Sequence, residues 1–435
     1  MLKDKLTAVL NEEELSRCMR CGFCQPACPT FRETGYEAAS PRGRIALMKA
    51  TAEGVMEPDQ DFIDQMNLCL GCRACEPVCP AGVQYGQLME QTREAIRDHV
   101  RHPWWVELLR LLAFHHLLPR QNRLYAAGRL LRFYQRSGLQ RTVRKWGLLR
   151  WLPVQLREME AVLPEACSRG LIRAVGPVVP PAGERKRRVG MFRGCIMDVL
   201  FHQTNVNTVR LLADAGCEVV IPAEQACCGA LHAHSGERER ARELAKRNVE
   251  AFRRAEVDLI VSNAGGCGAL LQEYDQLLRG DPQWESDAAW FAQRVRDISE
   301  VLADLVPMQQ WKPLDKRISY QSSCHLGNGM NVTRQPIALI QSIPDVTFVP
   351  LFEADRCCGS AGIYNLVQPE MSGRILDEKM THVTATNADI LVTSNPGCLL
   401  QMKAGVLRAG LADSMQVMHL VDLLAACSPI REPSS

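Results

Sequence analysis

Two cysteine motifs of the same form constrain the fold of this chain more than any other feature. The first extends from Cys18 to Pro29 and the second from Cys69 to Pro80, and both have the form C-x2-C-x2-C-x3-C-P. At this spacing, three thiolates of one short loop can bind three irons of the same [4Fe–4S] cluster, while the fourth thiolate binds the neighbouring cluster. The sequence therefore predicts two neighbouring clusters in one helical, ferredoxin-type domain that covers residues 1–100.

The crossed pattern assigns four ligands to each of the two clusters. We expect one cluster to be bound by Cys18, Cys21, Cys24 and Cys79, and the other by Cys69, Cys72, Cys75 and Cys28. Zinc and disulfides are the alternatives, but zinc ligand pairs usually lie farther apart and are not accompanied by a third cysteine. A c-type haem is excluded locally, because no histidine follows either C-x-x-C pair.

Four arginines lie close in sequence to these cysteines: Arg20, Arg42, Arg44 and Arg73. Thiolate-ligated clusters are negatively charged, so nearby cations raise their reduction potential. The alternative is that these are solvated surface arginines, as most arginines are.

The other cysteines and the first residues of the chain predict its compartment. The 435 residues include 19 cysteines, and Met1–Thr7 contains no apolar core of the length that a secretory signal needs. In a reducing compartment, clustered thiols indicate metal rather than disulfides. No run of about 18 or more apolar residues is present, so no membrane-spanning helix is expected. We expect a cytoplasmic protein, peripheral on the inner face of the cell membrane.

Residues 101–185 differ in composition from the cysteine-rich parts. Residues 101–157 contain 12 lysines and arginines, one acidic residue (Glu107) and four of the seven tryptophans. Amphipathic helices of this composition lie at the surface of anionic membranes. They could also dock an acidic partner subunit, or simply pack as core helices between domains. Nucleic acid is not expected as a partner, because no recognition motif is present. A proline-rich linker, residues 175–183, ends this segment.

After the linker the sequence repeats itself once. Three cysteine positions of the first copy recur in the second at offsets of 129 (Cys195 to Cys324), 130 (Cys227 to Cys357) and 131 (Cys267 to Cys398). Offsets so nearly equal indicate a tandem duplication. We expect two modules, at residues 186–312 and 313–430.

Within each module, the cysteines follow short β-branched runs, such as residues 259–262 and 390–393, and helical patterns follow the cysteines. This order predicts parallel α/β sheets, whose strand ends bring side chains together. We therefore expect two sets of four thiols: Cys195, Cys227, Cys228 and Cys267, and Cys324, Cys357, Cys358 and Cys398. Each set is either a metal or cluster site or a group of structural thiols.

Two ferredoxin motifs followed by two such modules, together with residues 40–44 and 192–198, resemble the iron–sulfur subunits of flavin-linked dehydrogenases, above all those of glycolate oxidase. The resemblance implies a multidomain α+β and α/β fold: a two-cluster domain, an amphipathic helical linker and two tandem cysteine-rich modules. It also implies electron transfer from FAD-containing subunits, which oxidise glycolate to glyoxylate, to a respiratory acceptor such as quinone. Subunits of lactate and glycerol-3-phosphate dehydrogenases are alternatives within the same resemblance.

The rival function is a thiol or disulfide reductase built on one of the modules. Heterodisulfide-reductase modules, which are similar, end in C-x-x-C, whereas Leu270 and Gln401 occupy the last positions here. His325 or His232 would be the proton donor of such an enzyme. No G-x-G-x-x-G after a strand and no P-loop is present, so we expect no flavin site in this chain.

Overall fold

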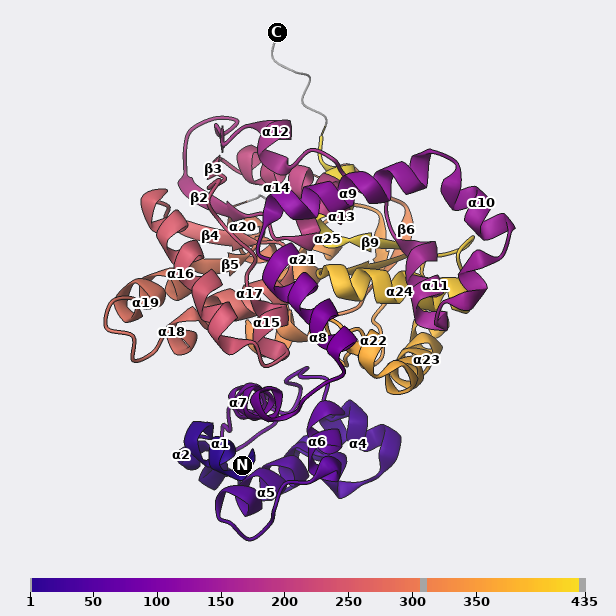
Figure 1. The fold of residues 1–435 in the computed structure, drawn as a ribbon. Coiled ribbons are helices and arrows are strands. Elements are labelled where there is room, and N and C mark those ends of the chain that lie inside the picture. The colour runs from indigo at the N-terminus through magenta and orange to yellow at the C-terminus, as the bar shows by residue number, and fades with distance from the viewer. Residues whose placement is uncertain (1, 306–310, 430–435) are drawn as a thin grey trace.

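The computed structural model describes residues 2–305 and 311–429. Figure 1 shows a helical N-terminal domain below two α/β modules that lie side by side, with the helices of residues 104–162 crossing one face of the modules. The first of these helices lies beside the N-terminal domain, where Arg97 pairs with Glu107 at 2.9 Å.

The N-terminal domain is helical throughout. Its elements are α1 (Leu2–Val9), α2 (Glu12–Arg17), α3 (Cys24–Ala27), α4 (Pro29–Thr34), η1 (Glu37–Ala39), α5 (Pro41–Ala52), α6 (Gln60–Asn67) and α7 (Tyr85–His99). Leu6, Met48, Met66 and Leu88 are buried together in its core. Ser40 caps α5 by accepting a hydrogen bond of 3.0 Å from the Gly43 backbone N–H, so this helix starts at an N-cap of the usual type.

The linker helices leave this domain and cross the modules. They are α8 (Trp104–Arg110), η2 (Leu111–Leu117, a π-helix), α9 (Gln121–Arg136), α10 (Leu139–Lys145), η3 (Leu148–Trp151), α11 (Val154–Val162) and α12 (Leu171–Val175). Phe114, Leu118 and Leu124 are buried against the first module, whereas most apolar side chains of α8, α10 and η3 are exposed. Within the described ranges, no helix has both the length and the apolar composition needed to cross a bilayer.

The first module contains a five-stranded sheet in the order β1-β3-β2-β4-β5. Its elements are β1 (Val178–Val179), β2 (Arg187–Phe192), α13 (Ile196–Leu200), α14 (His202–Asp214), β3 (Cys217–Val220), α15 (Ala230–His234), α16 (Arg238–Arg254), β4 (Leu259–Ser262), α17 (Gly265–Gln272), α18 (Tyr274–Leu277), α19 (Glu285–Arg294), β5 (Val295–Asp297) and α20 (Ile298–Leu305). All neighbours pair in parallel except β1 and β3. Part of the proline-rich segment is thus an edge strand of this sheet, which the sequence did not predict.

The second module repeats the four parallel strands in the order β7-β6-β8-β9. Its elements are β6 (Lys316–Tyr320), η4 (His325–Gly329), α21 (Gln335–Gln341), β7 (Val346–Phe348), α22 (Tyr364–Val367), α23 (Pro369–Ala385), β8 (Ile390–Thr393), α24 (Pro396–Arg408), β9 (Gln416–His419) and α25 (Leu420–Cys427). The equal strand order agrees with the duplication read from the sequence. One hydrophobic core contains residues of both modules, including Val189, Val219, Ile318 and Val392, so the modules form one packed body.

Candidate metal centres

The two cysteine loops of the N-terminal domain have the same backbone conformation. In the first loop, Arg20 and Gly22 have positive φ angles of 57° and 90°; in the second, Gly71 and Arg73 occupy the same motif positions with φ angles of 68° and 61°. A left-handed residue on each side of the second cysteine turns the chain tightly, so that successive thiols can point to one side. Two arginines accept a conformation that costs them energy, which is typical of a functional constraint.

The first four predicted ligands line one cavity. Cys18, Cys21, Cys24 and Cys79 all border a hollow that contains about 420 Å³ of space not filled by protein atoms, part of it open to solvent. Cys79 belongs to the second motif, so the chain brings the two motifs together at this cavity. Cys75 also borders it, which places one further thiol of the second motif beside the first group.

The second group of predicted ligands is buried. Cys28, Cys69, Cys72 and Cys75 each expose less than a tenth of their surface. Burial, followed by the neighbouring thiols of Cys72, Cys69 and Cys28, raises the pKa of Cys75 well above its ordinary value. Four thiols from the two motifs are therefore close enough to interact in a place that water does not reach.

A buried cation lies beside this second group. Arg44 is fully buried, and its guanidinium donates hydrogen bonds to Gln65 O (2.7 Å) and Thr30 Oγ1 (3.1 Å). Its Nη1 has no hydrogen-bond partner among the described residues. Burial opposes its charge, but Tyr85, Cys69 and Cys28 raise the pKa of Arg44. A buried cation that keeps an unused donor fits an anionic group such as a thiolate-ligated cluster.

The other three arginines near the motifs differ from Arg44. Arg42 is partly exposed and pairs with Glu37. Arg73 is mostly buried and pairs with Glu76 and Glu273, and Arg20 is exposed. Of the four arginines considered in the sequence, Arg44 is therefore the one whose environment differs most from that of a solvated surface residue.

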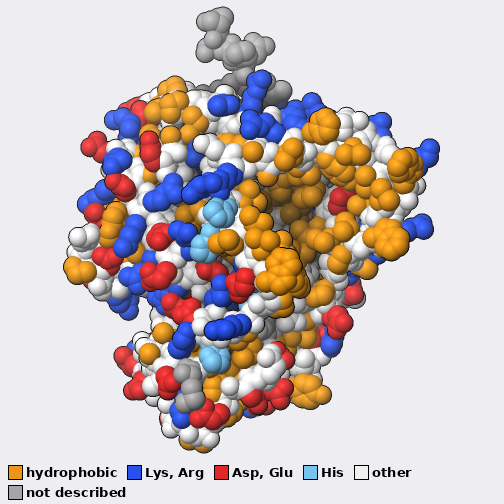
Figure 2. All heavy atoms as spheres, viewed as in Figure 1, with side chains coloured by type: hydrophobic (Ala, Val, Ile, Leu, Met, Phe, Trp, Pro, Cys, Tyr) orange, Lys and Arg blue, Asp and Glu red, His pale blue; other side chains and the backbone are white. Residues whose placement is uncertain are grey.

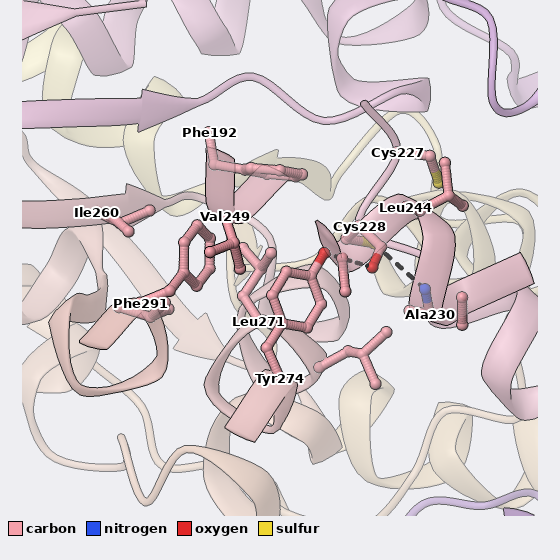
Figure 3. Packing of buried hydrophobic residues seen from close by; sticks show 14 of the residues in the cluster. Phe192, Cys227, Cys228, Ala230, Leu244, Val249, Ile260, Leu271, Tyr274 and Phe291 are labelled. Atoms are coloured by element: carbon pink, nitrogen blue, oxygen red, sulfur yellow. Dashed lines mark hydrogen bonds between the residues drawn. The ribbon is translucent and has the colours of Figure 1, made fainter. Parts of the chain in front are cut away.

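The four thiols of the first module meet at the strand ends, as the α/β pattern predicted. Cys195 Sγ is 3.5 Å from Cys227 Sγ, and Cys228 interacts with both Cys227 and Cys267. The hydrogen bond with Cys227, and burial, raise the pKa of Cys195 well above its ordinary value. Figure 3 shows the hydroxyl of Tyr274 directed at the backbone of Cys228, where it donates a hydrogen bond of 2.8 Å to the carbonyl oxygen.

The second module gathers its thiols in the same way, but in different surroundings. Cys324 interacts with Cys357, and Cys358 interacts with both Cys357 and Cys398. This set lies against the N-terminal domain: burial, followed by the thiol of Cys357, raises the pKa of Cys72 well above its ordinary value. The second thiol set is therefore adjacent to the buried predicted ligands, a relation that no sequence pattern indicated.

Hydrogen bonds fix this junction. Asn328 Nδ2 donates to Cys72 O at 2.9 Å, and the Tyr364 hydroxyl donates to Leu68 O at 2.8 Å. Leu70, Cys72, Cys357, Tyr364, Met371 and Ile375 form a shared apolar cluster. The buried thiols Cys195, Cys227 and Cys228 of the first module instead share an apolar cluster with Phe114 of the linker.

The histidines proposed for the rival reductase are poorly suited to donate protons. Burial is the main cause that lowers the pKa of His325 to about 3, and its Nδ1 is 3.4 Å from Cys324 Sγ. His232 is buried, which lowers its pKa, and its Nε2 donates to Phe114 O at 2.8 Å. Both imidazoles are therefore neutral near pH 7.

A carboxylate–histidine group, Glu353, Glu378 and His382, also has the spacing of a cation site. However, Arg32 and Arg356 each form ion pairs with both of its glutamates. The carboxylates are thus already neutralised, and the group links α4 of the N-terminal domain to the second module.

Comparison with known families agrees with this organisation. Residues 14–83 match the model described as "4Fe-4S dicluster domain", residues 105–163 match "Glycolate oxidase iron-sulfur subunit, linker region", and residues 189–272 and 318–403 match "Cysteine-rich domain". These matches confirm the predicted fold class and the prediction of two [4Fe–4S] clusters in the N-terminal domain. The exact domain boundaries remain predictions.

Individual relatives extend over nearly the whole chain. A Bacillus subtilis protein described as "Probable glycolate oxidase iron-sulfur subunit" is 52% identical, with 95% of this chain and 94% of that protein aligned. The "Glycolate oxidase iron-sulfur subunit" of Escherichia coli is 31% identical, with 91% and 92% aligned. The "Lactate utilization protein A" of Geobacillus kaustophilus is 32% identical, over 55% of this chain and 99% of its own length.

Among solved structures, a hypothetical protein from Helicobacter pylori has a TM-score of 0.52 and 8% identity. The match covers 98% of this chain and 74% of that protein. At this identity the likeness concerns the fold alone.

Proposed function

Because this chain belongs to the family of glycolate oxidase iron–sulfur subunits, we propose that it is the electron-transfer subunit of a flavin-linked glycolate dehydrogenase complex. In this function it receives electrons from FAD-containing partner subunits, which oxidise glycolate to glyoxylate, and delivers them to a respiratory acceptor such as quinone. Oxidation of the 2-hydroxy acid belongs to the partner. The observation that carries the proposal is the succession of thiol groups, from a cavity open to solvent to a buried group beside the second module.

We propose the crossed ligand sets predicted from the sequence: Cys18, Cys21, Cys24 and Cys79 for the outer site, and Cys69, Cys72, Cys75 and Cys28 for the inner site. The shared cavity of the first set and the mutual interactions of the second support this assignment. When bound, a [4Fe–4S] cluster takes up and releases one electron at a time. The chain's own contribution is to hold the thiolates, to exclude water from the inner site and to balance its charge with Arg44.

The surface around the outer cavity supports it as the docking site of the flavoprotein. Met19 and Phe23 border the cavity and are 65% and 66% exposed, and Tyr36 on the same domain is 71% exposed. Large exposed apolar side chains commonly mark protein–protein contacts. Electrons then enter where the thiol cavity is open to solvent and move toward the buried group.

The linker supports peripheral contact with a membrane. Figure 2 shows apolar side chains gathered over the linker helices, around a hollow. Leu130 and Phe133 on α9, Trp146 directly after α10 and Trp151 on η3 are exposed. The same three helices contain eight of the 12 basic residues of segment 101–157. Exposed tryptophans together with basic side chains favour an anionic lipid surface. We propose that this surface places the complex on the inner face of the cell membrane.

The electron-transfer function is tested with protein purified anaerobically, alone and together with its flavoprotein partner. Cluster reduction is followed by electron paramagnetic resonance after addition of glycolate, lactate or glycerol 3-phosphate. We expect reduction only when both the flavoprotein and glycolate are present. Reduction by a substrate in the absence of the flavoprotein would contradict the assignment of catalysis to another subunit. If lactate or glycerol 3-phosphate reduces the clusters in the presence of a flavoprotein and glycolate does not, the chain belongs to a different complex.

A further inference from the structure

A second pocket lies where α7, α8 and the first module meet. Its volume is about 400 Å³, which is within the range of roughly 300–1,000 Å³ typical of small-molecule sites. Trp104, Leu108 and Leu111 form its apolar wall, and Arg97, Arg110, His115 and Glu237 form most of its polar wall. A ligand that fits this pocket has an apolar part and a polar part.

The apolar wall is one face of a helix. Trp104, Leu108 and Leu111 recur at helical spacing, so they share a side of α8 and its continuation. Trp105 and Leu109 have the same pattern shifted by one residue and do not border the pocket. Trp104 is 77% exposed, which is unfavourable for a tryptophan unless a ligand or a partner covers it.

The charges of the polar wall already compensate one another. Arg97 Nε and Arg110 Nη2 are 3.2 Å and 3.0 Å from Glu237 Oε1, and Arg97 Nη2 is 2.9 Å from Glu107 Oε2. Two guanidinium groups facing two carboxylates leave little net charge for an anionic ligand. The pocket therefore suits an uncharged ligand that accepts hydrogen bonds.

One donor on this wall is available to such a ligand. It is His115 Nε2, because Nδ1 of the same ring already accepts a hydrogen bond of 3.0 Å from Arg240 Nη2. His115 lies in the π-helix Leu111–Leu117, and its Nε2 is 3.6 Å from Glu237 Oε2, beyond a normal hydrogen bond. Short π-helical turns occur frequently at functional sites, and this one places Leu111 and His115 on the same pocket.

A chain of hydrogen bonds connects the pocket to the loop of the inner thiol group. Arg93 Nη2 donates to Cys69 O at 2.5 Å, and its Nη1 donates to His234 O at 3.1 Å. Arg110 Nη2 donates to the next carbonyl, Ser235 O, at 3.1 Å. Arg97 follows Arg93 by one turn of α7, which is about 6 Å along the helix axis. The pocket is thus connected to the Cys69 loop through Arg110, the backbone of His234 and Ser235, and Arg93.

We propose that this pocket binds the ring of a lipid-soluble quinone, of which one carbonyl oxygen accepts a hydrogen bond from His115 Nε2 and of which the apolar tail lies along Trp104 and Leu108. The proposal rests on the electron-transfer function proposed above. Reduction of the quinone to the quinol takes two electrons and two protons. The electrons are those released when the partner oxidises the 2-hydroxy acid to the 2-oxo acid, and the protons come from the solvent to which the pocket is open.

Binding is tested without turnover, using the full chain and a photoreactive azido-benzoquinone. We expect the label on the peptide that contains residues 104–115, with competition by excess decyl-benzoquinone. Leu108→Trp fills the pocket, and Trp104→Ala removes one wall. Each should lower the labelling roughly tenfold. A tenfold change corresponds to about 1.4 kcal/mol of binding free energy, which is the order of magnitude of one aromatic contact. Trp105→Ala is the matched control, because Trp105 is the neighbouring tryptophan of α8 and does not border the pocket; it should leave the labelling unchanged.

The second measurement uses the complex with the flavoprotein in lipid-free detergent. We expect the KM for decyl-benzoquinone to rise roughly tenfold in Leu108→Trp and Trp104→Ala, with a fall in the ratio of the quinone rate to the ferricyanide rate. Label at another place, or an equal effect of Trp105→Ala, would overturn the quinone pocket while leaving the electron-transfer function intact. If glycolate fails to reduce the wild-type clusters, the electron-transfer function itself is wrong, whatever the labelling result.

Discussion

Replacing Arg44 with glutamine should lower the reduction potential of the inner site. The guanidinium is 3.1 Å from Thr30 Oγ1, which is 3.2 Å from Cys28 Sγ, so Arg44 lies within about 6 Å of that thiol. At this separation and an effective dielectric constant of about 20, one unit charge changes the energy of an added electron by roughly 3 kcal/mol. For a one-electron couple this corresponds to a decrease on the order of 100 mV, because the reduced cluster loses a compensating cation.

The potential is measured by redox titration with electron paramagnetic resonance, which separates the two clusters. Arg44→Lys is the control that keeps the charge but loses the planar hydrogen-bond fork; it should retain most of the potential. Arg42→Gln is a second control, since Arg42 is partly exposed and already paired with Glu37, and it should shift either potential much less. If both potentials stay at their wild-type values in Arg44→Gln, the inner site is not where we assign it.

Three further predictions concern other parts of the chain. Cys79→Ser should eliminate the same spectral signal as Cys18→Ser, although the two cysteines belong to different motifs; loss of different signals would refute the crossed ligand sets. Burial raises the pKa of Asp297 to about 7, although its hydrogen bonds with Ser299 oppose the shift. Because the carboxyl of the unfolded chain ionises near pH 4, the free energy of unfolding should fall as the pH rises from about 4 to 7. Asp297→Asn should remove up to about 4 kcal/mol of this loss. Denaturant unfolding of both proteins at pH 5 and pH 8 measures the difference, and equal pH profiles would contradict it. The double variant Trp146→Ser and Trp151→Ser should bind anionic vesicles more weakly in flotation, with wild-type binding weakened by salt; salt-independent flotation of both proteins would argue against an anionic lipid surface.

The sequence was sufficient to predict the features that depend on local pattern. The β-branched run at residues 259–262 is β4, and the run at residues 390–393 is β8. Ser40 is the N-cap of α5 and Pro41 its first residue, a local order that is typical of a helix start. Each of these signals lies within a few residues of the structure that it specifies, because caps and strand periodicity are local properties.

Other features depend on contacts between distant segments and could not be predicted. Nothing near Tyr364 in the sequence indicates that its hydroxyl bonds to Leu68 O, because the partners are almost three hundred residues apart. Arg44 was weighed as a surface residue, as arginine usually is, and its burial follows from the packing of α4, α5 and α6 around it. The short strand β1 was read as a linker, because Gly176, Pro177 and Pro180 flank its two valines and its pairing depends on the distant strand β3.

The two modules share an ancestor in sequence and in strand order, yet their thiol sets have different neighbours. The N-terminal domain packs against the second module through Cys72 and Cys357, while the linker occupies the corresponding part of the first module through Phe114. Of the two thiol sets, the second lies next to predicted cluster ligands of the N-terminal domain. Selection on the two sets is therefore expected to differ. The thiol of Cys357 lies next to Cys72 of the inner site, whereas the first module contacts the same cysteine loop through the ion pair of Glu273 with Arg73. A change at Cys357 should for this reason alter the spectrum of the inner site, and the equivalent change at Cys227 should leave it as it is.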